Sequence, residues 1–238
     1  MILTAHQPLY LPWLGLFHKA ALADGFCLVD SVQYLPKEFM NRNRIKTPQG
    51  PMWLTVPVQR KGYRDKETRE IEINNVLDWR RKHWKALQIN YGKAPYFSRY
   101  ADFFEDVYKR DWQYIAQLNE HILRWLFQEL GIKGGFWKTS ELGVEGKKSD
   151  FVLDMCKKLG ADLYIFGALG KDYAKREDFI KAGIKLYFQD YQHPQYLQLH
   201  GEFLSHMSIV DLLFNHGPRS LEILMEGNIT KEKLERQG

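Results

Sequence analysis

Polar side chains that could bind or protonate a ligand follow the first apolar segment of the sequence. Residues 2–5 predict a strand, and His6, Gln7 and Tyr10 come directly after it in HQPLYLPWLG. An imidazole titrates near neutral pH, so His6 suits general acid–base catalysis. The alternative for His6 is structural, with its ring bonded to a backbone carbonyl group.

A second polar set follows the next predicted strand, at 25–30. Asp30 and Gln33 lie at its end in VDSVQY, and the segment NRNRIK then alternates two residue types at Asn41, Arg42, Asn43 and Arg44. Arginine matches phosphate and carboxylate groups bidentately, and asparagine adds neutral hydrogen bonds to sugar or base groups. The pattern predicts a loop that clamps an anion, and a solvated basic run is the alternative.

Three later segments add candidate residues. His83 lies in WRRKHW, Lys171 and Tyr173 lie in GALGKDY, and Asp211 lies in SIVDLLFNHG. A glycine-rich turn at a helix start lets backbone N–H groups approach an anion, although such turns also occur without a ligand. We predict catalytic roles for His6 and His83, and substrate-binding roles for the other residues named so far.

The late histidines do not predict a metal site. The spacings of His193, His200, His206 and His216 match no compact ligand pattern such as HExxH. The sequence also lacks a GxSxG elbow and a cysteine in a polar segment. It therefore predicts acid–base chemistry on an anionic ligand and identifies no cofactor.

The elements that must position these side chains alternate between strand and helix. Strands are predicted at 2–5, 25–30, 135–139, 163–166 and 184–188, and helices begin near Pro12, Ser149, Asp172 and Ser208. This order predicts an α/β fold with a mainly parallel, doubly wound (Rossmann-like) sheet. Ligands bind such sheets beyond the carboxyl ends of the strands, so we expect the turns after 2–5, 25–30 and 163–166 to share one edge.

Two regions depart from this alternation. Segments 52–58 and 69–74 predict an antiparallel hairpin, and periodic apolar residues predict helices at 77–91, 97–109 and 111–130. The expected domains are an α/β core of residues 1–76 and 132–222, a helical insert of 77–131, and a charged C-terminal helix or tail of 223–238.

Composition indicates an ordinary globular chain with a basic surface. The net charge of the 238 residues is +5, which favours anionic partners such as nucleotides or nucleic acid. No apolar run reaches the roughly 18 residues that span a bilayer, and no signal-peptide pattern is present, so we expect a cytoplasmic protein. Cys27 and Cys156 lie in apolar runs, which indicates buried free thiols. The oligomeric state stays open.

Several of these segments together resemble the WbqC-like protein family. The resemblance rests on HQPLYLPWLG, LVDSVQY, NRNRIKTPQGPMWLTVPV, WRRKHW, YGKAPYF and SIVDLLFNHG, and it covers nearly the whole chain. Members of this family are described mainly from bacterial gene clusters that build O-antigen and other surface polysaccharides, so the resemblance implies a biosynthetic setting. Ser31 stands where family members often carry a second aspartate, which weakens any mechanism that needs paired carboxylates there.

The leading hypothesis is a transferase of surface-polysaccharide biosynthesis that adds a small acyl or aminoacyl group to a nucleotide-linked sugar. His6 or His83 would move the proton, and the basic residues of NRNR and GALGK would hold the anion. A nucleic-acid-binding module is the first alternative, because of the net charge, NRNR and WRRKHW. A nucleotidyltransferase-like enzyme is the second, although the H-x-G-H spacing of that class is absent. A non-catalytic scaffold, the third, predicts a pocket without convergent polar side chains.

Overall fold

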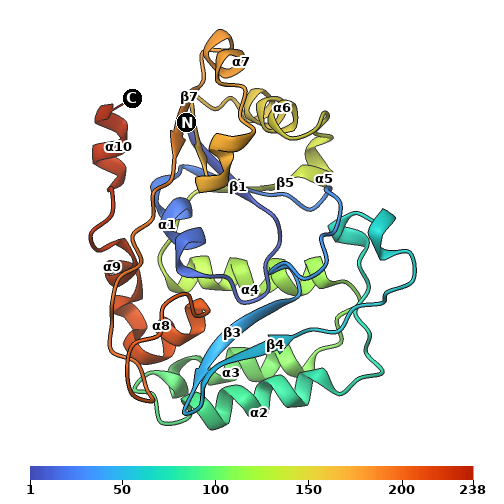
Figure 1. Cartoon of the computed structure of the whole chain (residues 1–238), viewed down its shortest axis with the longest axis vertical. Coiled ribbons are helices and arrows are strands. Elements are labelled where there is room, and N and C mark those ends of the chain that lie inside the picture. Colours follow the sequence, from blue (N-terminus) through green and yellow to red (C-terminus); the bar gives the residue numbers. More distant parts are fainter. Residues whose placement is uncertain (238) are drawn as a thin grey trace.

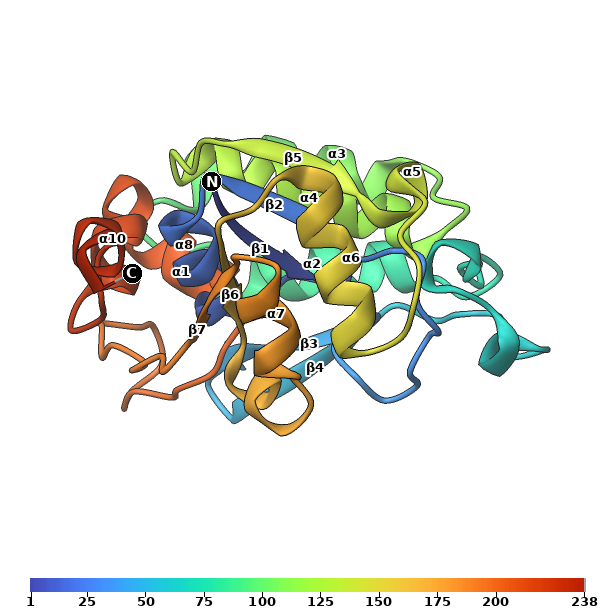
Figure 2. The ribbon, with the colours of Figure 1, turned by 90° about the horizontal axis from the view of Figure 1, so that it is seen from above.

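Five parallel strands form the central sheet of the protein (Figures 1 and 2). The computed structural model describes residues 1–237, and the strand order in it is β5-β2-β1-β6-β7. The strands are β1 (Ile2–His6), β2 (Gly25–Leu28), β5 (Gly135–Lys138), β6 (Leu163–Phe166) and β7 (Lys185–Phe188). The predicted α/β fold with a mainly parallel, Rossmann-like sheet is therefore confirmed.

The strand order reverses beside the central strand β1. From β1 the chain moves outward through β2 to β5, and it then returns to the other side of β1 to form β6 and β7. His6 pairs with Leu28, and Thr4 pairs with Ile165, so the carboxyl ends of β1, β2 and β6 lie at one edge. The prediction that the three polar turns share this edge is confirmed, and the reversal lies between β1 and β6.

Helices cover both faces of the sheet. Side chains alternate between the two faces along each strand, so each face packs against its own layer of helices. In Figure 1 the lower helices are α1 (Leu14–Leu22) and α4 (Ile115–Glu129), and the upper ones are α6 (Ser149–Leu159) and α7 (Arg176–Lys181). Phe26 packs edge-on against Phe127 of α4, a helix below the sheet in Figure 1, whereas Leu3 clusters with Val152 of α6 and Phe179 of α7, helices above it.

A separate antiparallel hairpin lies below α4 in Figure 1 and corrects one prediction. Its strands are β3 (Arg42–Thr47) and β4 (Gly50–Thr55). The predicted pairing of 52–58 with 69–74 is present only as one antiparallel bridge, between Val58 and Ile73, and the regular hairpin instead pairs RNRIKT with GPMWLT. In β3 only Arg42 and Arg44 are partly exposed, and the buried residues include Asn43 and Lys46, which an apolar pattern does not reveal.

Three consecutive helices form most of the layer beneath the sheet in Figure 1. They are α2 (Trp79–Tyr91), α3 (Phe97–Lys109) and α4, which begin and end within a few residues of the predicted bounds. The helix α8 (Ile209–His216) joins them, with Phe214 packed against Phe104. One continuous hydrophobic core connects α1, α4 and these helices, so it crosses the expected boundary between core and insert. The domain boundaries themselves stay predictions.

The C-terminal part of the described chain is helical. The helices are α9 (Ser220–Met225), which crosses the expected boundary at 222–223, and α10 (Lys231–Gln237). Leu234 of α10 is buried beside Ile2 and Leu22, and residue 238 of the expected tail lies outside the described residues. Cys27 and Cys156 are buried free thiols, as predicted. No helix within residues 1–237 has the length and apolar character to cross a membrane.

Candidate functional site

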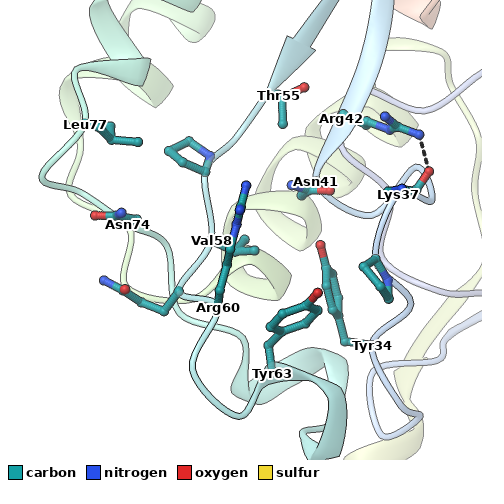
Figure 3. Close-up of a pocket in the computed structure, with 13 residues that line it drawn as sticks. Tyr34, Lys37, Asn41, Arg42, Thr55, Val58, Arg60, Tyr63, Asn74 and Leu77 are labelled. Carbon is teal, nitrogen blue, oxygen red and sulfur yellow. Dashed lines mark hydrogen bonds between the residues drawn. The ribbon is translucent and has the colours of Figure 1, made fainter.

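A cleft of about 710 Å³ opens beside the hairpin, between the segments that precede β3 and follow β4 (Figure 3). Three basic side chains, Lys37, Arg42 and Arg60, line it together with the tyrosines Tyr34 and Tyr63. Among the described residues, no aspartate or glutamate lines this cleft. Basic groups without competing carboxylates suit an anion, and aromatic rings suit a planar or sugar ring beside it.

The two tyrosines are set at an angle to each other in the wall of the cleft. Their ring centroids lie 5.9 Å apart with an interplanar angle of 76°. In Figure 3 both hydroxyl groups, and the guanidinium of Arg60, extend into the space between the drawn side chains. Burial raises the pKa of Tyr34 to about 12, so its hydroxyl stays protonated at neutral pH and can donate a hydrogen bond.

Arg42 and Arg44 leave the outer face of β3 beside an exposed tryptophan. The guanidinium carbon lies 4.5 Å from the Trp53 ring centroid for Arg42 and 5.5 Å for Arg44, and Trp53 is 44% exposed. Arg42 also donates to the Lys37 carbonyl group (Figure 3). Within residues 1–237 neither arginine forms an ion pair, and both Nε atoms are buried without an acceptor. An anion would relieve this cost of unpaired buried donors.

Asn41, just before β3, and Asn43 within β3 are both buried. The Asn43 amide donates to the Leu11 carbonyl oxygen at 2.6 Å, and the Asn41 amide donates to the Val56 carbonyl oxygen at 2.8 Å. Leu11 has a φ of +46°, which is uncommon for leucine, and the Asn43 bond holds it in this conformation. These amides fix the backbone around the cleft. Their predicted contact with substrate stays a prediction.

Tyr10 and His83 come together away from the cleft lining. The Tyr10 hydroxyl lies 2.8 Å from His83 Nδ1 and 2.6 Å from the Tyr108 hydroxyl, and all three side chains are buried. Burial lowers the pKa of His83 to about 4, so the ring is neutral at pH 7. This closed network ties the HQPLYLPWLG loop to α2 and α3 and supports a structural role for His83.

His6 and Gln7 lie at the carboxyl edge of the sheet and stay partly exposed. His6 Nδ1 lies 3.0 Å from the Gln7 carbonyl oxygen, which accepts its N–H. Burial, and then the charge of Lys19, lower the pKa of His6 to about 3, so the ring is neutral with Nε2 as an acceptor. Lys19 is 4% exposed and was missed by the sequence analysis. The available signal was the lysine that follows His18 within the mostly apolar segment of α1.

Asp30 and Gln33 make internal hydrogen bonds after β2. The Asp30 carboxylate accepts from the Ser140 backbone N–H at 2.9 Å and from its hydroxyl at 2.7 Å, where α5 (Thr139–Leu142) begins. Gln33 donates to the Arg64 carbonyl group at 2.5 Å. Asp30 also lines a second cavity of about 500 Å³ whose side chains carry both signs of charge. These bonds link β2 to β5 and to the loop beside the cleft.

Asp211 is fully buried, far from any exposed edge. Its carboxylate accepts from the hydroxyls of Tyr91 and Tyr196, each at 2.9 Å, and from the Gln198 amide at 2.7 Å. Burial raises its pKa. Asp211 therefore joins α8, α2 and the segment before α8, and its predicted contact with substrate remains untested.

Lys171 and Tyr173 lie at the end of the turn after β6, and both are exposed. A Cβ on Gly170 would lie 2.5 Å from the Phe166 side chain, so packing explains the second glycine of GALGK. Gly167 faces open space, which leaves room for a ligand at the turn. Within the described chain, no three His, Cys, Asp or Glu side chains gather closely enough to hold a metal ion.

The geometry defines a doubly wound α/β protein with a basic, tyrosine-lined cleft beside its β3–β4 hairpin. The chain belongs to the WbqC-like protein family, whose model matches residues 7–223. It is 34% identical over 220 residues to the uncharacterized protein Rv1507c of Mycobacterium tuberculosis strain H37Rv, and the match covers 92% of this chain and 95% of that relative. No solved structure matches the chain significantly.

Proposed function

We propose that this protein is a cytoplasmic transferase of surface-polysaccharide biosynthesis that acts on a nucleotide-linked sugar. The group transferred is a small acyl or aminoacyl unit. The observation that supports this function is the lining of the cleft, which combines Lys37, Arg42 and Arg60 with Tyr34 and Tyr63 and contains no carboxylate among residues 1–237. A nucleotide sugar has a matching chemistry, because its diphosphate is anionic and its base and sugar are rings.

The size and the donors of the cleft support this assignment. A volume of about 710 Å³ falls in the range of roughly 300–1,000 Å³ that small-molecule sites occupy. The guanidinium of Arg60 and the free Nε of Arg42 would bind the diphosphate, and the tyrosine hydroxyls would donate to sugar or phosphate oxygens. The diphosphate would thus supply an acceptor for the Arg42 Nε, which has none among residues 1–237.

Proton transfer is assigned to His6. A hydroxyl or amine of the sugar would attack the carbonyl carbon of an activated acyl donor such as a thioester, and the bond from that carbon to the donor's leaving group would break. Nε2 of His6 would take the proton of the nucleophile and pass it to the leaving group. The Gln7 carbonyl group fixes the required tautomer by accepting the Nδ1 proton. His6 is preferred to His83 because His6 is partly exposed, whereas His83 is buried with its ring engaged.

Calorimetry with UDP-glucose and GDP-mannose tests the cleft. We expect Arg60→Gln to weaken the affinity at least about tenfold, the worth of one charge-assisted hydrogen bond. Arg42→Lys should weaken it as well, because a point charge replaces a planar fork. Lys85→Gln, an exposed lysine outside the cleft, is the matched control and should leave the affinity unchanged. Equal affinities in all three variants would remove the cleft from the proposal.

The outer face of the hairpin favours a second candidate, a module that binds single-stranded nucleic acid. Trp53 lies between two arginines and beside Phe39, whose ring centroid is 5.9 Å away and which is 39% exposed. Exposed aromatic and guanidinium groups stack on bases. A salt titration with single-stranded oligonucleotides would show a slope of roughly 0.7 per phosphate contacted, and absence of binding at low salt would exclude this candidate.

A further inference from the structure

Lys19 differs from the other charged side chains that are buried in the described chain. The carboxylates of Asp30 and Asp211 each accept several hydrogen bonds, and the Lys46 ammonium donates to two carbonyl groups, those of Gly201 and Glu202. The Lys19 ammonium donates one bond, to the Ala5 carbonyl oxygen at 2.7 Å. Within residues 1–237 it forms no ion pair, so two of its three N–H donors are without a partner.

The neighbours of Lys19 in α1 do not explain its presence. His18, the adjacent residue, bonds Gln189 at 2.8 Å through Nδ1 and faces the Ile229 carbonyl oxygen at 3.3 Å through Nε2. It is therefore partnered on both ring nitrogens. Lys19 is buried to the same degree and has no second acceptor.

The position of Lys19 is that of a ligand site in this class of sheet. Ala5, its acceptor, is the next-to-last residue of β1, and His6 follows it at the point where the strand order reverses. His6, Gln7 and Gly167 are partly exposed, so solvent reaches the carboxyl edge of the sheet next to the Ala5 carbonyl group that Lys19 binds. A charge without an acid partner costs free energy in a protein interior, and an anion at this edge would offset that cost.

We propose that Lys19 and His6 form an anion subsite at the carboxyl end of β1, which takes a phosphate or carboxylate group. The anion pairs with the Lys19 ammonium from the solvent side. His6 keeps its Nδ1 bond to the Gln7 carbonyl group and stays neutral, and its ring lies beside the bound anion, so its signals report binding. Lys19 is thus a binding residue on α1 that is more deeply buried than His6 and Gln7 of HQPLYLPWLG.

This inference rests on the proposed function in one respect, since it places an anionic group, distinct from the diphosphate bound in the cleft, beside the proton-transfer residue. The two can fail separately. Loss of nucleotide-sugar binding with an intact anion response at His6 would refute the cleft, and intact nucleotide-sugar binding without that response would refute the subsite.

Histidine NMR of the full chain measures the subsite. The chain has eight histidines, so a sample labelled at the ring carbons gives few signals. The signal that is missing in His6→Asn is that of His6. Inorganic phosphate and acetate are added separately at pH 7. A shift with phosphate alone identifies a phosphate site, a shift with acetate alone identifies a carboxylate site, and no shift of the His6 signal with either anion overturns the proposal.

Lys19→Met provides the decisive variant and Lys46→Met the matched control, because both remove a buried ammonium group. We expect the anion affinity to fall at least tenfold in Lys19→Met and to be unchanged in Lys46→Met. If Lys19→Met does not fold, Lys19→Gln keeps a donor for the Ala5 carbonyl group without the charge, and thermal melting confirms its fold. An unchanged affinity in the folded Lys19 variant would show that the lysine is not part of the site.

Discussion

The polar groups buried beneath the sheet and those at its carboxyl edge differ in how completely they are bonded. Beneath the sheet, Tyr10, His83 and Tyr108 form a closed network, and Asp211 has three donors. At the edge, Lys19 donates one hydrogen bond. Burial of a polar side chain is therefore not in itself a sign of function. A complete set of partners indicates architecture, and an incomplete set beside solvent indicates binding.

Asp211→Ala tests the fully bonded network beneath the sheet and should cause the largest change in the free energy of unfolding. It removes the acceptor of Tyr91, Tyr196 and Gln198 from a fully buried position. We expect the free energy of unfolding, measured by urea denaturation, to fall by about 3–5 kcal/mol. The exposed Asp102→Ala on α3 is the control and should change it by less than about 0.5 kcal/mol. A similar small change in both would mean that the Asp211 network is not closed.

Lys19→Met tests the incompletely bonded group at the sheet edge. It should stabilise the protein, whereas Asp211→Ala destabilises it. Removal of a buried ammonium group without an acid partner should raise the free energy of unfolding at pH 7 by about 1–3 kcal/mol. A loss of stability instead would show that Lys19 stabilises the fold. The sheet edge would then not differ in this respect from the region beneath the sheet.

The pH dependence sharpens this expectation. Burial lowers the pKa of Lys19 from 10.5 to about 7, so between these values the unfolded chain binds a proton that the folded chain has released. Stability contributed by this group therefore rises with pH from about 7 to about 10.5. The advantage of Lys19→Met over the parent should be largest at or below pH 7 and should shrink by pH 10. A constant difference across this range would contradict the lowered pKa.

Tyr10→Phe should have the smallest effect of the three. The change leaves His83 Nδ1 without its donor and Tyr108 without its partner, but it leaves the ring packing intact. We expect a loss of about 1–2 kcal/mol in the free energy of unfolding. Tyr114→Phe, whose hydroxyl bonds the exposed Gln113 side chain, should change it by less than about 0.5 kcal/mol. Comparable losses in both variants would place the Tyr10 hydroxyl outside a buried network.

Local patterns were sufficient for the parallel sheet and its edge. Apolar runs that alternate with amphipathic helices predict parallel strands, and parallel strands put the turns after β1, β2 and β6 at one edge. The hairpin was misplaced because Asn43 is buried through a hydrogen bond to the Leu11 carbonyl group, 32 residues away in sequence. Such a bond leaves no trace in an apolar periodicity.

The cleft could be predicted only in part. Asn41 and Arg42 of NRNR do line it, but Tyr34, Tyr63 and Arg60 come from irregular segments whose contacts depend on the tertiary fold. Tyr34 is placed by a backbone bond to the Lys66 carbonyl group at 3.1 Å, and no local spacing encodes that pairing. Asp211 attracted a functional interpretation because a buried carboxylate and a catalytic one have the same sequence signature. Their hydrogen-bond partners separate them.

The central position of β1 also has a consequence for the order in which the chain can fold. Ile2 pairs with Leu163 and Thr4 with Ile165, so the middle of the sheet joins segments about two-thirds of the chain apart. At roughly 5–20 residues per second, a ribosome takes on the order of ten to thirty seconds to synthesise the intervening chain. During that time one edge of β1 has no partner, and its buried residues Leu3 and Ala5 await their covering helices. We expect nascent chains that end before β6 to depend on chaperones.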